Sequence, residues 1–169
     1  MSALAAVTSS APPTRCIWRW PPAALAESPS RADGIAPHLE RALRASGVAA
    51  AIDMCRRLHR ERMRAPAATA AILFHRFFMR QSLARHDRLV VASAAFLLAC
   101  KVEEMSRRTR QVLAAAYCTV HGVEMAPWDS VDAPAYRGWR ERILDMERVL
   151  MLSLIHISEP TRLRRISYA

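Results

Sequence analysis

The stretch LVVASAAFLLACKVEE, which runs from Leu89 to Glu104, decides the fold. Every residue from Leu89 to Cys100 is apolar or small, so a helix over this stretch has no polar face to turn toward water. A helix of that kind belongs in the centre of a bundle. It is too short to span a membrane, which takes about 20 apolar residues. Asp87 stands just before it as a suitable N-cap.

The composition around this stretch also favours helix. The 169 residues include only 4 glycines, and 52% of them are hydrophobic. Ala, Leu, Arg and Met dominate, and these are good helix formers. The sequence therefore predicts an all-α domain. Five helices are expected, over residues 37–59, 66–82 and 87–104, then one beginning at Ser106 as N-cap, and the last over 136–152.

Apolar residues at helical spacing give the four outer helices one face each toward the core. The residues expected on these faces are, in chain order, Val48, Ile52, Cys55, Leu58; Ile72, Leu73, Phe77; Val112, Leu113, Ala116, Tyr117, Val120; and Trp139, Ile143, Met146, Leu150. Residues 1–27 are rich in Ala, Ser and Pro and are expected to form a flexible N-terminal arm, with Trp18 and Trp20 as candidates to anchor it.

The chain carries a net charge of +10, and 24 of its 25 basic residues are arginine. Such a balance permits attraction to nucleic acid or to acidic proteins. However, the arginines are spread along the chain, as they would be on a solvated helical surface. The charge alone therefore does not identify a partner.

Motifs of catalysis and metal binding are missing from the sequence. The spacing of Cys16, Cys55, Cys100 and Cys118 matches no zinc motif, and free cysteines fit a reducing compartment. There is no Gly-rich phosphate loop and no nucleophile elbow. We expect a protein that is not an enzyme, with no cofactor, no metal, no small-molecule substrate and no membrane partner.

Three charged residues border the apolar faces of the third and fifth helices. Lys101, the only lysine of the chain, ends the buried third helix, and Glu104 follows close enough to hold its ammonium group. Glu147 lies between Ile143 and Leu150 at the edge of the fifth helix's apolar face. Charged groups in such positions are often no more than the solvated borders of a core, so the pattern by itself leaves a structural role open.

Three motifs give these residues a more specific meaning. KVEE at Lys101–Glu104, preceded by AAFLLAC, resembles the hallmark of the cyclin box. FHRFFMRQS at Phe74–Ser82 resembles the second helix of cyclin T, and SPSRADGI at Ser28–Ile35 resembles the start of the cyclin T and K domains. The chain is thus similar to transcription-type cyclins, above all cyclin T, and next cyclins K and L.

The resemblance implies a fold and a role. Cyclins contain two repeats of five helices, with the third helix of the first repeat at the centre. Residues 28–151 would be that first repeat, and the second repeat would be missing. In the family, the lysine of KxEE and an acid in the fifth helix grip the regulatory helix of a cyclin-dependent protein kinase; here these are Lys101 and Glu147, with Glu104 as an additional contact. The implied location is the nucleus and the implied process is RNA polymerase II elongation.

The end of the sequence departs from this resemblance. LSLIHISEPTR, from Leu152 to Arg162, resembles the translation of a sequencing adapter. Residues 152–169 are therefore expected to be an artefact rather than a native segment. Met105–Ser106 is a smaller departure, since cyclins T usually have proline there.

A second interpretation has a different functional class. The cyclin fold also occurs in general transcription factors that bind DNA, and the positive charge permits such binding. This alternative rests on the analogy of fold. It predicts binding that weakens steeply with salt and does not depend on Lys101.

Overall fold

A computed structural model describes residues 20–58, 64–105, 108–124 and 134–158 of the chain. Their secondary structure is helical throughout, and no strand occurs in these ranges. The helices are α1 (Pro22–Ala26), α2 (Pro29–Ala32), α3 (Pro37–Leu58), α4 (Arg64–Phe78), α5 (Arg88–Val102), α6 (Thr109–His121) and α7 (Pro134–Ser158). The predicted all-α class is confirmed.

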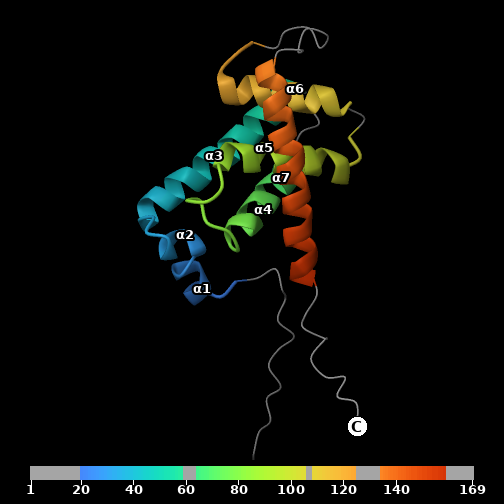
Figure 1. The fold of residues 1–169 in the computed structure, drawn as a ribbon. Helices are drawn as coiled ribbons and strands as arrows, with labels where there is room; N and C mark the ends of the chain where they lie inside the picture. Colours follow the sequence, from blue (N-terminus) through green and yellow to red (C-terminus); the bar gives the residue numbers. More distant parts are fainter. Residues whose placement is uncertain (1–19, 59–63, 106–107, 125–133, 159–169) are drawn as a thin grey trace, which may run out of the picture.

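Helix α5 is the centre of the bundle (Figure 1), as its unbroken apolar sequence predicts. It packs against α3, α4, α6 and α7. All residues from Val90 to Cys100 are buried. Asp87 caps the helix as expected, because its Oδ1 accepts a hydrogen bond of 2.9 Å from the backbone N–H of Leu89. Four alanines in this run let the neighbouring helices approach closely.

The four longer outer helices turn most of their predicted faces inward, although several of the predicted residues are only partly buried: Val48, Ile52, Leu58, Tyr117, Val120 and Met146. Ile72 was expected inside, but 48% of its surface is exposed. Phe74, two residues later, is fully buried and takes the inward position. The inward face of α4 is formed by residues at helical spacing, namely Ala70, Leu73, Phe74, Phe77 and Phe78. Ile72 lies on the opposite side of the helix from Phe74.

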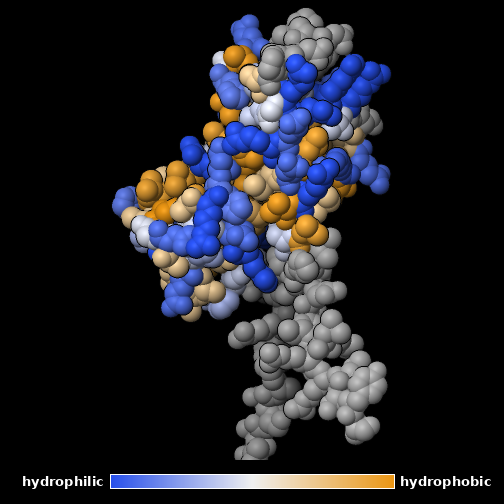
Figure 2. Space-filling view, in the orientation of Figure 1, coloured by the Kyte–Doolittle hydropathy of each residue, from blue (hydrophilic) through white to orange (hydrophobic). Residues whose placement is uncertain are grey.

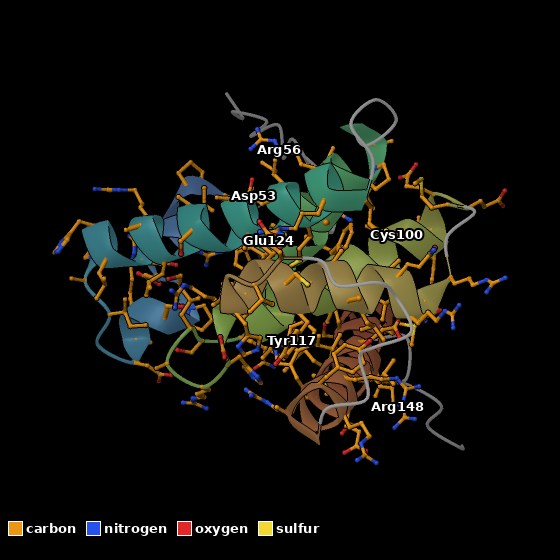
Figure 3. The ribbon with its side chains drawn as sticks, turned by 90° about the horizontal axis from the view of Figure 1, so that it is seen from above. Asp53, Arg56, Cys100, Tyr117, Glu124 and Arg148 are labelled. Atoms are coloured by element: carbon orange, nitrogen blue, oxygen red, sulfur yellow. The ribbon has the colours of Figure 1, made fainter. Side chains whose placement is uncertain are left out.

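Helices α6 and α7 close the bundle through aromatic packing. The Tyr117 ring lies 5.5 Å from the rings of both Tyr136 and Trp139, edge to face in each case. Figure 3 looks down on this region, and Tyr117 lies where α6 meets α7. Trp139 and Ile143 are buried, which confirms the apolar face predicted for the fifth helix.

Several boundaries differ from expectation. The fourth long helix begins at Thr109 with Arg108 as the residue before it, so the prediction of Ser106 as N-cap was wrong, and Ser106 itself lies outside the described residues. Helix α4 ends at Phe78 rather than at Ser82. Helix α7 continues past Leu152 to Ser158.

The two short helices, α1 and α2, were not predicted. Helix α1 lies within the segment expected as a flexible arm, and Trp18 lies outside the described residues. Helix α2 lies in the SPSRADGI segment; its N-cap, Ser28, accepts a hydrogen bond from the backbone N–H of Arg31. Most of the predicted arm and residues 159–169 of the predicted tail lie outside the described ranges.

A buried carboxylate anchors α2 to α3 and α4. Glu40 Oε1 accepts hydrogen bonds from Ser28 Oγ at 2.8 Å and from Arg44 Nε at 2.9 Å, and its Oε2 accepts one from Arg31 Nε at 2.8 Å. Arg44 also donates to the backbone oxygen of Phe78 at 2.7 Å. A single network therefore joins three helices and satisfies a carbonyl at the end of α4.

Candidate functional site

Lys101 and Glu147 meet where the C-terminal end of α5 crosses α7. Lys101 Nζ lies 2.7 Å from Oε1 of Glu147 and donates a hydrogen bond of 2.9 Å to Oε2. The two residues are 46 positions apart in the sequence. The structure thus brings together two of the three residues singled out from the sequence, and they come from the two predicted helices.

The two partners differ sharply in exposure. Half of the Lys101 side chain is open to solvent, whereas the Glu147 side chain is only 6% exposed. Glu147 Oε1 is buried and has no hydrogen bond of good geometry within the described part of the chain. That oxygen nevertheless lies 2.7 Å from the Lys101 ammonium nitrogen, whose charge compensates it. The pair therefore offers an outside molecule a half-exposed ammonium group that is held in place by a buried carboxylate.

The backbone beyond Lys101 is fixed by a helix-ending turn. The N–H of Met105 donates to the carbonyl of Cys100 at 2.9 Å, and the N–H of Glu104 donates to the carbonyl of Lys101 at 3.2 Å. This is the hydrogen-bond pattern of a Schellman motif, whose C′ position is usually glycine. Here the C′ residue is Glu104, with a φ of +50°.

Glu104 does not hold the Lys101 ammonium group, contrary to expectation. Among the described residues no ion pair joins Glu104 to Lys101, and Glu104 is exposed. The reason is local: the left-handed backbone at Glu104 takes its side chain off the helical path that the sequence argument assumed. Glu104 nevertheless borders the same end of α5.

Glu103, its neighbour, has a structural role that sequence reasoning missed. Its Oε1 accepts a hydrogen bond of 2.6 Å from the hydroxyl of Thr69, which lies in α4. The bond joins α4 to the end of α5 and so supports the position of Lys101. No sequence signal pairs these residues, because they are 34 positions apart.

Exposed apolar residues follow both members of the ion pair in the sequence. Val102 follows Lys101 in the sequence and is 59% exposed. On α7, Val149, Met151 and Leu152 follow Glu147 and are also exposed. Figure 2 shows apolar residues among hydrophilic ones along the lower part of α7. Apolar residues exposed on the two helices that carry a charged pair are compatible with a protein-binding surface.

The described ranges show no metal site, no membrane-spanning helix and no activated thiol at Cys55 or Cys100. They contain no group of three His, Cys, Asp or Glu residues that could hold a metal ion, and none of their helices is long and apolar enough to cross a membrane. Burial raises the pKa of the Cys55 thiol to about 12, and burial together with the nearby Cys55 raises the pKa of the Cys100 thiol to about 12. These thiols are packing groups rather than nucleophiles.

Comparisons with known proteins agree with the geometry. Residues 29–156 match the family described as "Cyclin, N-terminal domain". The chain is 35% identical to Cyclin-T1-4 of Arabidopsis thaliana over 128 residues, which cover 75% of the chain and 23% of that protein. It is 31% identical to Cyclin-T1 of Equus caballus over 137 residues, 81% of the chain and 18% of that protein.

A third relative is Cyclin-K of Homo sapiens, 29% identical over 143 residues, which cover 83% of the chain and 23% of that protein. The chain therefore spans about a quarter or less of the length of these relatives. The family match covers well over half of the chain, and the helices with the central α5 correspond to about one cyclin-box repeat. The chain belongs to the cyclin family, of which it holds an N-terminal domain.

Proposed function

We propose that the chain is part of a cyclin that binds and activates a cyclin-dependent protein kinase through Lys101, Glu147 and Glu104. The observation that carries the proposal is the ion pair between α5 and α7, in which the buried Glu147 carboxylate holds a half-exposed Lys101 ammonium group. A lysine has three donors and can donate to backbone carbonyls. The exposed part of the ammonium group therefore suits the carbonyl groups at the end of a kinase helix.

The proposed mechanism is differential binding rather than chemistry on the cyclin. Phosphoryl transfer by protein kinases needs a lysine–glutamate ion pair whose glutamate lies on the kinase's regulatory helix. A surface that binds this helix only in its inward position shifts the population toward the active state. Lys101 would supply the polar part of that surface, with Glu147 holding it in place, and the exposed Val102 an apolar part.

The backbone conformation of Glu104 supports the proposal that this residue belongs to the kinase-binding surface. A left-handed conformation costs a residue with a side chain about 1 kcal/mol relative to glycine. A carboxylate near the C-terminal end of a helix is also unfavourable for the helix dipole. Stability alone would favour glycine at this position, so we assign the Glu104 carboxylate to contact with the kinase.

We further propose residues 28–151 as the first repeat of a two-repeat cyclin. The names of its relatives, Cyclin-T and Cyclin-K, support a transcription-type cyclin. On this proposal the protein acts in the nucleus, in RNA polymerase II elongation. The assignment of residues 152–169 to an adapter stays a prediction, which the nucleotide sequence of the gene would test.

Kinase activation is the direct test. Purified kinase is assayed with a peptide substrate in the presence of the unchanged chain, the Lys101→Ala variant or the Glu147→Gln variant. Both variants are expected to lose most of the activation while keeping their helical circular dichroism. Arg56→Ala is the matched control, since Arg56 is an exposed arginine of α3 paired with Asp53.

The same variants distinguish the nucleic-acid alternative. Binding to DNA would fall steeply with salt and be unchanged in Lys101→Ala. Full kinase activation by Lys101→Ala, together with salt-sensitive binding to DNA, would contradict the kinase proposal and favour the alternative.

A further inference from the structure

A pocket of about 550 Å³ lies between α1, α3 and α4, on a different side of the molecule from the candidate site. Figure 1 shows α1 and α2 at the lower left, whereas the C-terminal end of α5, which carries Lys101, lies on the right. The pocket is lined by Trp20, Leu25, Arg31, Glu40, Arg41, Arg44, Ile72, His75, Arg76 and Met79. The proposed kinase surface uses none of these residues.

The lining of the pocket combines apolar and cationic groups. Ile72 and Leu25 are each about half exposed, and both line this pocket. Four arginines line the same space against one carboxylate, Glu40. An apolar surface rimmed by charges of one sign matches a ligand with an apolar group and the opposite charge.

The single carboxylate is paired with Arg31 and Arg44, but not with Arg41. Glu40 is buried and already accepts hydrogen bonds from Ser28, Arg31 and Arg44. Arg41 is exposed and has no ion pair among the described residues. It is thus a guanidinium group at the pocket that is available to an anion.

His75 adds no positive charge of its own to the pocket. Partial desolvation and the charge of Arg44 lower the pKa of this imidazole, so it is neutral at pH 7. Arg44 itself is fixed, because it donates to Glu40 and to the carbonyls of His75 and Phe78. Arg44 is thus committed to the network around Glu40, which leaves Arg41 as the arginine that the proposal uses for a ligand.

From this arrangement we infer that the pocket between α1, α3 and α4 is a docking site for an acidic linear peptide of a partner protein, with one apolar side chain inserted between Ile72 and Leu25 and carboxylates next to Arg41. This goes beyond the proposed binding of a kinase. A cyclin with such a site would bring a second protein to the kinase without using the kinase-binding surface.

The chain's own sequence does not supply this occupant. Residues 1–19 contain Arg15 and Arg19 but no Asp or Glu. A second copy of the chain carries a net charge of +10, which opposes association at a basic site. An acidic peptide from another protein matches both the charge and the apolar floor.

The test is fluorescence anisotropy with a labelled peptide whose central Leu-Phe pair is flanked by runs of glutamate. We expect saturable binding that weakens roughly tenfold in Arg41→Glu and clearly in Ile72→Ser. Arg56→Glu is the matched control, because it makes the same charge reversal on the same helix, about 22 Å further along α3. Figure 3 labels Arg56 beside its partner Asp53. The affinity of Arg56→Glu for the peptide should stay close to that of the unchanged chain.

Several results would overturn the inference. Equal losses in Arg41→Glu and Arg56→Glu would mean non-specific attraction to a basic protein. Equal binding of a peptide in which glycines replace the Leu-Phe pair, or tighter binding of a single-stranded RNA that Ile72→Ser leaves unchanged, would exclude an apolar anchor. Tighter peptide binding after removal of residues 1–19, or a dimer that Arg41→Glu dissociates, would assign the pocket to the chain itself.

Discussion

Lys101 and Glu147 form an ion pair of 2.7 Å across two helices that are separated by 46 positions in the sequence. The buried position of Glu147 makes it dependent on Lys101 for compensation, while Lys101 remains half exposed. Removal of the lysine would leave a buried carboxylate without its cation, which is more damaging than removal of an exposed charge. The pair is therefore both a link between α5 and α7 and the polar centre of the surface proposed to bind a kinase.

The close approach of α3 to α4 depends on Gly47. A Cβ placed there would lie 2.3 Å from the ring of Phe74, which is fully buried and packs edge to face on Phe78. We expect Gly47→Ala to lower the free energy of unfolding by about 1–2 kcal/mol, because overpacking outweighs the gain in helix propensity. Chemical denaturation would measure it.

Gly138→Ala is the control for this prediction. Gly138 also lies within a helix, α7, but a Cβ there would meet nothing within 4 Å. It should raise the free energy of unfolding by about 0.5–1 kcal/mol. Equal effects of the two substitutions would contradict the close packing of Gly47 on Phe74.

Glu40 should make stability dependent on pH. Burial alone would raise the pKa of Glu40, but hydrogen bonds from Ser28, Arg44 and Arg31 outweigh it and hold the pKa below its ordinary value of 4.5. The carboxylate therefore stabilises the fold above about pH 4.5, and this stabilisation is lost as the pH falls through the lower pKa of the folded state. Glu40→Gln should cost about 2 kcal/mol at neutral pH, and the difference should shrink in acid.

Urea denaturation over a series of pH values would measure this difference. Asp53→Asn is the control, since Asp53 forms an exposed pair with Arg56 and surface pairs contribute little. A difference between the chain and Glu40→Gln that stays constant into acid would mean that the network does not depend on the charge.

Glu104→Gly should separate stability from function. Glycine fits the left-handed φ of +50° without strain, so the free energy of unfolding should rise by about 1 kcal/mol. If Glu104 contacts the kinase, the same substitution should weaken kinase binding. Thermal unfolding and a binding titration on one preparation give both values; higher stability with unchanged binding would remove Glu104 from the proposed site.

The buried thiols should resist modification. Cys55 and Cys100 are buried and their pKa values are about 12, so hardly any thiolate forms at neutral pH. In a Cys16→Ser background, both should react with a thiol reagent only after denaturant is added. Mass spectrometry of the modified peptides would identify the residues, and rapid labelling of Cys100 in the native chain would contradict the central position of α5.

The sequence predicts the bundle well because one helix has no polar face. A run such as Val90–Cys100 is stable in water only when other helices surround it, so the position of α5 follows from its composition alone. Helices α1 and α2 escaped prediction because each has at most five residues and they are held by tertiary contacts such as that between Ser28 and Glu40. Short helices have little periodicity to detect.

The candidate site was predicted in part for a similar reason. Lys101 and Glu147 are marked by their places on apolar helix faces, and the resemblance to cyclins pointed to the same two residues. The predicted contact between Glu104 and Lys101 is absent from the structure. The sequence could not reveal this, because a left-handed backbone at a non-glycine residue has no sequence signal. The pairing of Thr69 with Glu103 and the pocket around Arg41 depend on how helices meet, which local patterns do not specify.

A binding cycle at Lys101 and Glu147 tests the central claim most directly. The dissociation constant of the kinase complex is measured for the chain, Lys101→Ala, Glu147→Ala and the double variant. Each single substitution should cost about 2–5 kcal/mol of binding free energy, and the double variant little more than either, because the two side chains act as one unit. Binding that is unchanged in both single variants, while their helical content is retained, would contradict the account.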